Sequence, residues 1–180
     1  MKQLICLILL TFSSLSAFAT QVTITTNLGN IEVELYDNKS PITVKNFLSY
    51  VDEGYYSDTI FHRVMPGFMI QGGGFTQDLA QKRSKPPIAY EGQNGLFNDR
   101  GALAMARTNN PNSATSQFFI NHVANPFLNH GVNGYGYTVF GKVTKGMDIV
   151  DKIAAQSTGN VGPYQNVPHT PVIIQSITRI

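Results

Sequence analysis

Residues 61–74 read FHRVMPGFMIQGGG, two short runs of strand-forming residues separated by Pro66-Gly67, which predicts a bend or bulge between two strands. Side chains alternate between the two faces of a strand, so this stretch assigns each residue to a face. One predicted face carries a cation, two thioethers and an amide: Arg63, Met65, Met69 and Gln71. The opposite face is mostly aliphatic and holds His62, Val64 and Ile70.

Arg63 has no acidic residue in this stretch with which it could pair. One interpretation is an edge-strand charge, which discourages pairing with other chains. The other is a cation kept on an apolar surface for a ligand or substrate. The stretch alone is compatible with both.

The chain before this stretch predicts a β-hairpin followed by a helix. Residues 21–36, QVTITTNLGNIEVELY, alternate apolar and polar side chains on both sides of a turn. Ser40 then supplies an N-cap, and Pro41 the first helical position. The apolar residues of this helix recur at helical spacing as far as Gly54: Ile42, Phe47, Leu48 and Val51. A second helix is predicted from 147 to 155.

The remaining apolar runs are short, and Gly, Pro and Asn cluster between them. They cover residues 60–65, 67–71, 101–106, 117–121, 138–143 and 172–180. This pattern predicts a mainly β fold, an antiparallel sheet or barrel with the two helices covering its openings. Residues 75–98 are predicted to form a surface loop, and loops of this length are often functional.

The first nineteen residues, MKQLICLILLTFSSLSAFA, have the layout of a secretory signal peptide: a positive start, an apolar run and a small-x-small cleavage site ending at Ala19. The alternative, a transmembrane anchor, needs roughly 20 apolar residues, about twice the unbroken run present. We therefore expect 1–19 to be cleaved and 20–180 to form one domain in the periplasm. Cys6, the only cysteine, would be lost with the signal.

Composition limits the classes of partner. The chain has 180 residues, 42% hydrophobic and 13% charged, which suits one globular domain. Without Lys2, twelve basic residues oppose eleven acidic ones, a balance that indicates neither a nucleic-acid nor a membrane partner. Gly72-Gly73-Gly74 lacks the spacing of a nucleotide-binding loop. The four histidines have no paired spacing typical of a metal site.

Two further blocks carry a family resemblance: GALAMARTNNPNSATSQFFIN, residues 101–121, and NPFLNHGVNGYGYTVFGKV, residues 125–143. Read with 61–74, they resemble the cyclophilins, a family of cyclosporin-binding peptidyl-prolyl cis-trans isomerases, and most closely the bacterial periplasmic branch. The resemblance covers essentially the whole chain after the signal. It implies a closed eight-stranded antiparallel β-barrel capped by two α-helices, acting as a monomer without cofactor or metal.

The resemblance also implies the site. Arg63 would be catalytic, with Gln71 supporting it and the substrate carbonyl. The proline pocket would consist of Phe68, Met69, Phe119 and Leu128. The peptide backbone before the proline would contact Ala106, Arg107 and Gln117. At two further substrate-binding positions, many family members have Trp and His where this chain has Phe127 and Tyr137. Because the indole donates a hydrogen bond to cyclosporin-type peptides, we expect weak binding of these inhibitors.

The implied substrates are proline-containing segments of unfolded or partly folded exported proteins, and the implied role is to assist their folding. A second hypothesis is a binding module, a chaperone or adaptor that holds proline-containing segments and in which catalysis is incidental. Arg63 favours the enzyme, because simple apolar binding has no use for a cation.

Overall fold

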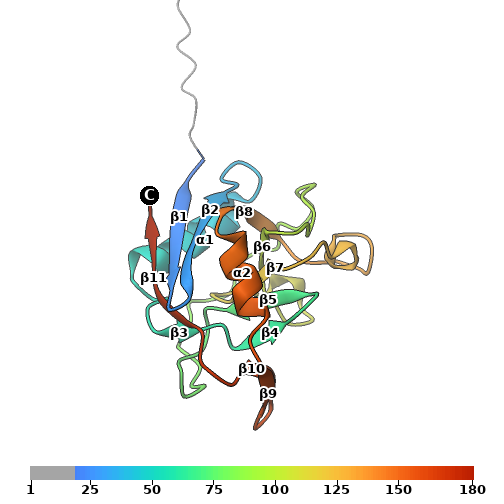
Figure 1. Ribbon diagram of the computed structural model, residues 1–180. Coiled ribbons are helices and arrows are strands. Elements are labelled where there is room, and N and C mark those ends of the chain that lie inside the picture. The colour runs from blue at the N-terminus through green and yellow to red at the C-terminus, as the bar shows by residue number, and fades with distance from the viewer. Residues whose placement is uncertain (1–18) are drawn as a thin grey trace, which may run out of the picture.

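A computed structural model describes residues 19–180 as a mainly β protein with two α-helices (Figure 1). The predicted signal peptide, except for Ala19, lies outside the described residues. The helices are α1 (Pro41–Asp52) and α2 (Met147–Ala154), with short 3₁₀ turns η1 (Pro111–Ser113) and η2 (Pro126–Leu128). The strands are β1 (Gln21–Thr26), β2 (Gly29–Leu35), β3 (Thr59–Ile60), β4 (Arg63–Met65), β5 (Met69–Gly72), β6 (Ala102–Met105), β7 (Phe118–Asn121), β8 (Val139–Lys145), β9 (Thr158–Val161), β10 (Tyr164–Pro168) and β11 (Ile173–Arg179).

Nine of these strands form one antiparallel sheet in the order β3-β11-β1-β2-β8-β6-β7-β5-β4. Its two end strands, β3 and β4, are separated by only residues 61–62 in the chain, so the sheet must curl until its edges approach each other. The result is a strongly curled half-barrel. The mainly β fold with two helices is confirmed, whereas the closed eight-stranded barrel remains a prediction.

The stretch at 61–74 folds as its alternation predicts. Arg63 pairs with Gln71, Val64 with Ile70, and Met65 with Met69 across β4 and β5. Directly opposed residues of an antiparallel pair share a face, so the cation, thioethers and amide do lie together. Val64 and Ile70 are fully buried on the other face.

The two faces of this part of the sheet contribute to different apolar clusters. The inner cluster is the main core, and both helices pack into it, α1 through Phe47 and α2 through Val150 and other residues. The outer cluster is smaller and lies beneath the loops that follow β5 and β7: its buried members are Met69, Ala102, Ala104, Phe119, Leu128 and Val139. The candidate site is built on this outer cluster.

Helix α1 begins at the predicted proline, but two details of the prediction are wrong. Ile42 is 46% exposed, because the buried stripe at Val44, Phe47, Leu48 and Val51 lies on a different side of the helix. Ser40 occupies the N-cap position without capping, since its hydroxyl donates to the Val139 carbonyl at 2.8 Å. The N–H groups of Ile42 and Thr43, in the first turn of α1, donate instead to the carboxylate of Glu91, which comes from another part of the chain.

Residues 75–98 contain no helix or strand of the main sheet and join β5 to β6, as predicted. The hairpin of β9 and β10 was not predicted. It projects from the bottom of the view in Figure 1, and its two-residue connection is Gly162-Pro163, with Gly162 at φ 56°. None of the helices in residues 19–180 is long and apolar enough to cross a membrane.

Candidate active site

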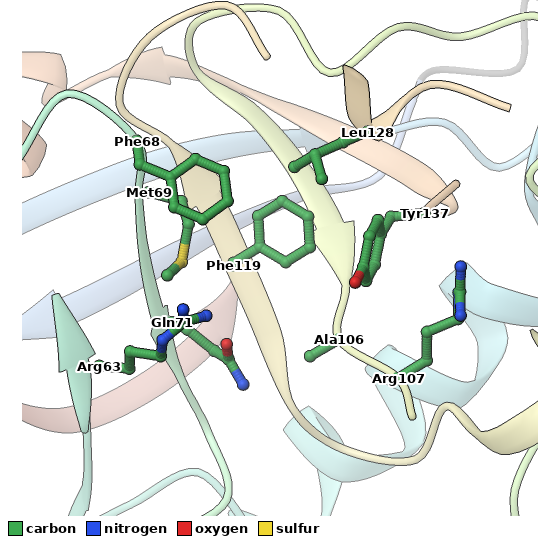
Figure 2. Close-up of a pocket in the computed structure, with 9 residues that line it drawn as sticks. All are labelled: Arg63, Phe68, Met69, Gln71, Ala106, Arg107, Phe119, Leu128 and Tyr137. Carbon is green, nitrogen blue, oxygen red and sulfur yellow. The ribbon is translucent and has the colours of Figure 1, made fainter. Parts of the chain in front are cut away.

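A pocket of about 130 Å³ opens on the outer cluster, beside the bend of 61–74 (Figure 2). Nine of the eleven predicted site residues line it: Arg63, Phe68, Met69, Gln71, Ala106, Arg107, Phe119, Leu128 and Tyr137. These residues are distant in sequence. The structure therefore brings together most of the site that the family resemblance implied.

Strand register sets the middle of the pocket. Arg63 on β4 is opposite Gln71 on β5, Gln71 is opposite Phe119 on β7, and Phe119 is opposite Ala104 on β6. Because opposed residues share a face, these side chains form a row across the outer face of the sheet. Figure 2 shows the Arg63 guanidinium turned toward Gln71, with the aromatic rings of the pocket beyond it.

Arg63 is half-buried and forms no ion pair with any carboxylate among residues 19–180. Strand β4 is an end strand of the hydrogen-bonded order, as the edge-charge interpretation requires. However, the side chain lines the pocket instead of standing alone on the surface. The pocket thus contains an unpaired guanidinium beside apolar walls.

Three other predicted polar residues, Gln71, Gln117 and Arg107, are held in place by hydrogen bonds. The Gln71 amide donates from Nε2 to Oε1 of Gln117 at 3.0 Å, so Gln117 lies next to a residue of the pocket lining without lining this pocket itself. Arg107 donates from Nε to the Gly136 carbonyl at 2.8 Å and from Nη1 to the Thr108 carbonyl at 2.7 Å. The Arg107 guanidinium is thereby directed away from the pocket centre, as Figure 2 also shows.

Aromatic contacts form the upper walls. Tyr137 meets Phe119 edge-on, with ring centroids 5.5 Å apart, and the Arg107 guanidinium lies 4.6 Å from the Tyr137 ring. Phe127 does not line the pocket itself. It stacks on Phe68 with centroids 5.6 Å apart and stays 47% exposed, so it extends the apolar surface beyond the pocket rim.

The sequence of residues 21–179 matches the family model described as cyclophilin type peptidyl-prolyl cis-trans isomerase/CLD. This match spans nearly all of the described chain. The protein belongs to the cyclophilin family.

Similar proteins support the same assignment. This cyclophilin is 54% identical to peptidyl-prolyl cis-trans isomerase A of Dickeya dadantii, with 98% of this chain and 97% of the relative covered. It is 56% identical to peptidyl-prolyl cis-trans isomerase B of Escherichia coli, with 87% and 98% covered. A crystal structure of a Cryptosporidium parvum cyclophilin matches with a TM-score of 0.73 at 32% identity, covering 91% of this chain and 98% of that one. The protein is therefore a peptidyl-prolyl cis-trans isomerase.

The pocket of this cyclophilin rests on buried amides that the sequence analysis missed. Asn125 donates from Nδ2 to the Phe68 carbonyl at 2.9 Å and to Oδ1 of Asn121 at 2.8 Å. Asn98 donates from Nδ2 to the Leu128 carbonyl at 3.0 Å and accepts from Asn121. All three asparagines are at most 2% exposed. Together they connect the main chains of two opposite pocket walls, at Phe68 and at Leu128. The sequence signal for them was the presence of polar side chains within or beside apolar strands.

No group of three or more His, Cys, Asp or Glu side chains in residues 19–180 of this cyclophilin is arranged to hold a metal ion. The functional groups that line the pocket are guanidinium, amide and phenol groups beside apolar side chains.

Proposed function

We propose that Arg63 is the catalytic residue of this cyclophilin and that it acts on the proline nitrogen of the substrate. The observation that carries the proposal is a guanidinium, unpaired with any carboxylate in the described chain, at the side of a small pocket whose walls include Phe68, Met69, Phe119 and Leu128. A proline ring is neutral and apolar, so binding the ring alone would not require a cation. A role in the reaction would.

The reaction is limited by the stiffness of the peptide bond. Resonance gives the C–N bond partial double-bond character and a rotation barrier of about 18–20 kcal/mol. Before proline the cis and trans forms differ by only about 0.5–1 kcal/mol, so both occur and their exchange is slow. In the twisted transition state the resonance is lost, and the proline nitrogen gains a free lone pair.

A guanidinium N–H beside that nitrogen can donate a hydrogen bond that the planar ground state cannot accept. Binding that is stronger in the transition state than in the ground state is what accelerates a reaction. Going from exchange in tens of seconds to about a thousand events per second requires roughly 6 kcal/mol, which one charged donor plus orientation can supply. The mechanism needs neither a covalent intermediate nor a proton transfer.

The apolar walls supply the orientation. We assign the pyrrolidine ring to the pocket formed by Phe68, Met69, Phe119 and Leu128. Holding the ring while the acyl side turns converts a free rotation into an oriented one. Tyr137 and Phe127 continue these walls at the rim.

The polar residues align the peptide. Gln71 is directly opposite Arg63, and Gln117 fixes its amide, so we assign Gln71 to the support of Arg63 and of the substrate carbonyl. We assign Ala106, Arg107 and Gln117 to the peptide backbone before the proline. Since the Arg107 guanidinium is engaged elsewhere, the main chain at 106–107 would make that contact.

We further propose that this cyclophilin acts in the periplasm on unfolded or partly folded exported proteins. The signal-like composition of residues 1–19 supports export, and two of its close relatives are bacterial isomerases. A shallow pocket that holds little beyond one proline suits many clients. Because Phe127 has no indole N–H, cyclosporin-type peptides should bind weakly; titration calorimetry that found tight binding would contradict this.

The test of Arg63 is Arg63→Lys, which keeps the charge but replaces a planar fork with a flexible stem. We expect turnover of an X-Pro peptide, measured by exchange NMR, to fall roughly 30- to 1000-fold, or about 2–4 kcal/mol. Peptide affinity, measured by titration, should stay within a few-fold of the parent. Circular dichroism serves as the folding control.

The other outcomes are equally informative. Turnover at the parent rate would show that Arg63 is not the catalytic group. Joint loss of binding and rate would identify Arg63 as an anchor for the bound peptide and would favour the binding-module hypothesis. Only loss of rate with retained binding agrees with a cation that serves the twisted amide.

A further inference from the structure

The turn that joins β4 to β5 is bonded to the side chains of His122, the residue after β7, and Asn125. Gly67 adopts φ 73°, and its N–H donates to Nδ1 of His122 at 3.0 Å. The next carbonyl, that of Phe68, accepts from the His122 main-chain N–H at 3.0 Å and from Asn125. His122 thus contacts this turn through both its imidazole and its main chain.

The other side of the same imidazole contacts helix α2. Because Nδ1 accepts from Gly67, the ring proton is on Nε2, which lies 3.1 Å from Oδ1 of Asp151. Arg100 binds both oxygens of Asp151 at 2.8 Å and also donates to the His122 carbonyl. The imidazole therefore connects the turn at Gly67 to an ion pair on α2.

We propose that His122 is a positioning residue for isomerisation, holding the turn of residues 66–68 so that Phe68 and Arg63 keep their places on either side of the proline. The proposal rests on the proposed roles of Arg63 and Phe68. It goes beyond them by assigning a function to a residue outside the pocket lining.

Local structure explains why this turn needs an anchor. Strand β4 has three residues, its only partner in the main sheet is β5, and the turn of residues 66–68 is the connection between the two strands. Phe68 is within the turn itself and forms a wall of the pocket. Movement of the turn would displace the cation and the wall relative to each other, and such misplacement is costly in an oriented reaction.

Two substitutions separate the two contacts of the imidazole. His122→Asn places an amide oxygen near the position of Nδ1 and can accept from Gly67, but it is too short to reach Asp151. His122→Gln reaches toward Asp151 but offers no acceptor at the Nδ1 position. The main-chain bond from His122 to Phe68 is the same in both variants, so each variant keeps one of the two imidazole contacts and loses the other.

We expect His122→Gln to lower kcat/KM for an X-Pro peptide roughly five- to tenfold. We also expect its Gly67 amide to exchange with solvent at least about tenfold faster by NMR. His122→Asn should retain at least about half of the parent kcat/KM and most of the Gly67 protection. This rescue is a readout that a general loss of stability would not produce, and urea unfolding measures that loss separately.

Arg100→Gln and Arg179→Gln serve as controls, because each removes one solvent-exposed pair with an aspartate, Asp151 or Asp52, and Arg100→Gln also removes the bond to the His122 carbonyl. Both should lose some stability, and neither should lower turnover more than about twofold, because neither removes the acceptor of the Gly67 N–H. Equal turnover in the Asn and Gln variants, or faster Gly67 exchange with parental turnover, would overturn the proposal. If neither His122 variant folds, a parent imidazole that NMR shows protonated at Nδ1 would overturn it. A failed role for Arg63 would appear separately, as parental turnover in Arg63→Lys.

Discussion

At the scale of single residues, His62 and Arg63 are consecutive but meet opposite environments. Arg63 faces the pocket, whereas His62 is 6% exposed and its Nδ1 has no hydrogen-bond partner in residues 19–180. Burial, and to a smaller degree the charge of Arg63, lower the pKa of His62 to about 4. The imidazole is therefore neutral above about pH 5 and adds no second charge beside the guanidinium.

This depressed pKa predicts acid destabilisation in a defined window. An unfolded histidine binds a proton near pH 6.5, whereas folded His62 does so near 4, so the unfolded chain binds more protons between these values. The free energy of unfolding should therefore fall as the pH drops from about 6.5 to 4, by up to about 3 kcal/mol. Urea unfolding across this range measures it.

His62→Phe keeps an aromatic ring beside Phe75 and removes the titrating nitrogens. The free energy of unfolding of this variant should change less with pH between 6.5 and 4. The slope should decrease by up to the amount that the binding of one proton produces. An unchanged slope would show that another group causes the acid sensitivity. The carboxyl groups whose pKa values are lowered by hydrogen bonds, Asp52 and Asp78, lose their contribution only at lower pH, below about 4.

At the scale of elements, α1 shows how a loop can complete a helix. The Ile42 and Thr43 N–H groups donate to the two carboxylate oxygens of Glu91 at 3.0 and 2.8 Å, and the Thr43 hydroxyl donates at 2.7 Å. A carboxylate at a helix N-terminus satisfies unpaired N–H groups and interacts favourably with the helix dipole. Glu91 belongs to the 75–98 segment, so this cap also fastens the long loop to helix α1.

Glu91→Ala should lower the free energy of unfolding by about 1–2 kcal/mol, because two helix N–H groups lose their acceptor. Glu91→Gln keeps one acceptor oxygen and should have an intermediate effect. Urea denaturation gives both values.

The matched control is Glu53→Ala at the other end of the same helix. Glu53 pairs with Lys85 on the surface at 2.5 Å, and such exposed pairs contribute about 0–1 kcal/mol. Equal losses for Glu91 and Glu53 would mean that the carboxylate of Glu91 acts as an ordinary surface charge and not as a cap.

At the scale of the whole molecule, the predicted cleavage site coincides with an anchored position. The Thr20 nitrogen donates to Oδ2 of Asp37 at 2.9 Å, and its hydroxyl donates to Oδ1 at 3.0 Å. Cleavage after Ala19 would convert this nitrogen from an amide to an ammonium group. The bond to Asp37 would then become a charge-assisted one, which is stronger than a neutral bond.

Asp37→Asn should therefore lower the free energy of unfolding more in a chain that starts at Thr20 than in a chain that retains residues 1–19. The additional loss should be about 0.5–1 kcal/mol. The four proteins to compare are the parent and Asp37→Asn, each with and without residues 1–19. Urea unfolding of all four gives the difference between the two losses. N-terminal sequencing of protein from the periplasmic fraction should find Thr20. Retention of Met1 there would contradict the cleavage, and equal losses in both chains would contradict the ammonium contact alone.

Local sequence determined those helices and strands of this protein whose conformation depends mainly on interactions between neighbouring residues. The alternation in 21–36 and 61–74 assigned residues to faces, and the proline at position 41 marked the first residue of a helix. These features depend on neighbouring residues only, so they can be read before folding. The β9–β10 hairpin was missed because its strands lack apolar alternation and bury only Val167 and Pro168, although Gly162-Pro163 was a usable turn signal.

The identity of the site residues came from the family resemblance, because no local pattern links positions as distant as Arg63, Arg107 and Tyr137. Only the tertiary structure decided how they meet: strand register aligns Arg63 with Gln71 and Phe119, and buried asparagines fix the walls. The same holds for the Glu91 cap and the His122 contacts. Each joins segments whose proximity results from the curl of the whole sheet, a long-range property that propensity and spacing do not encode.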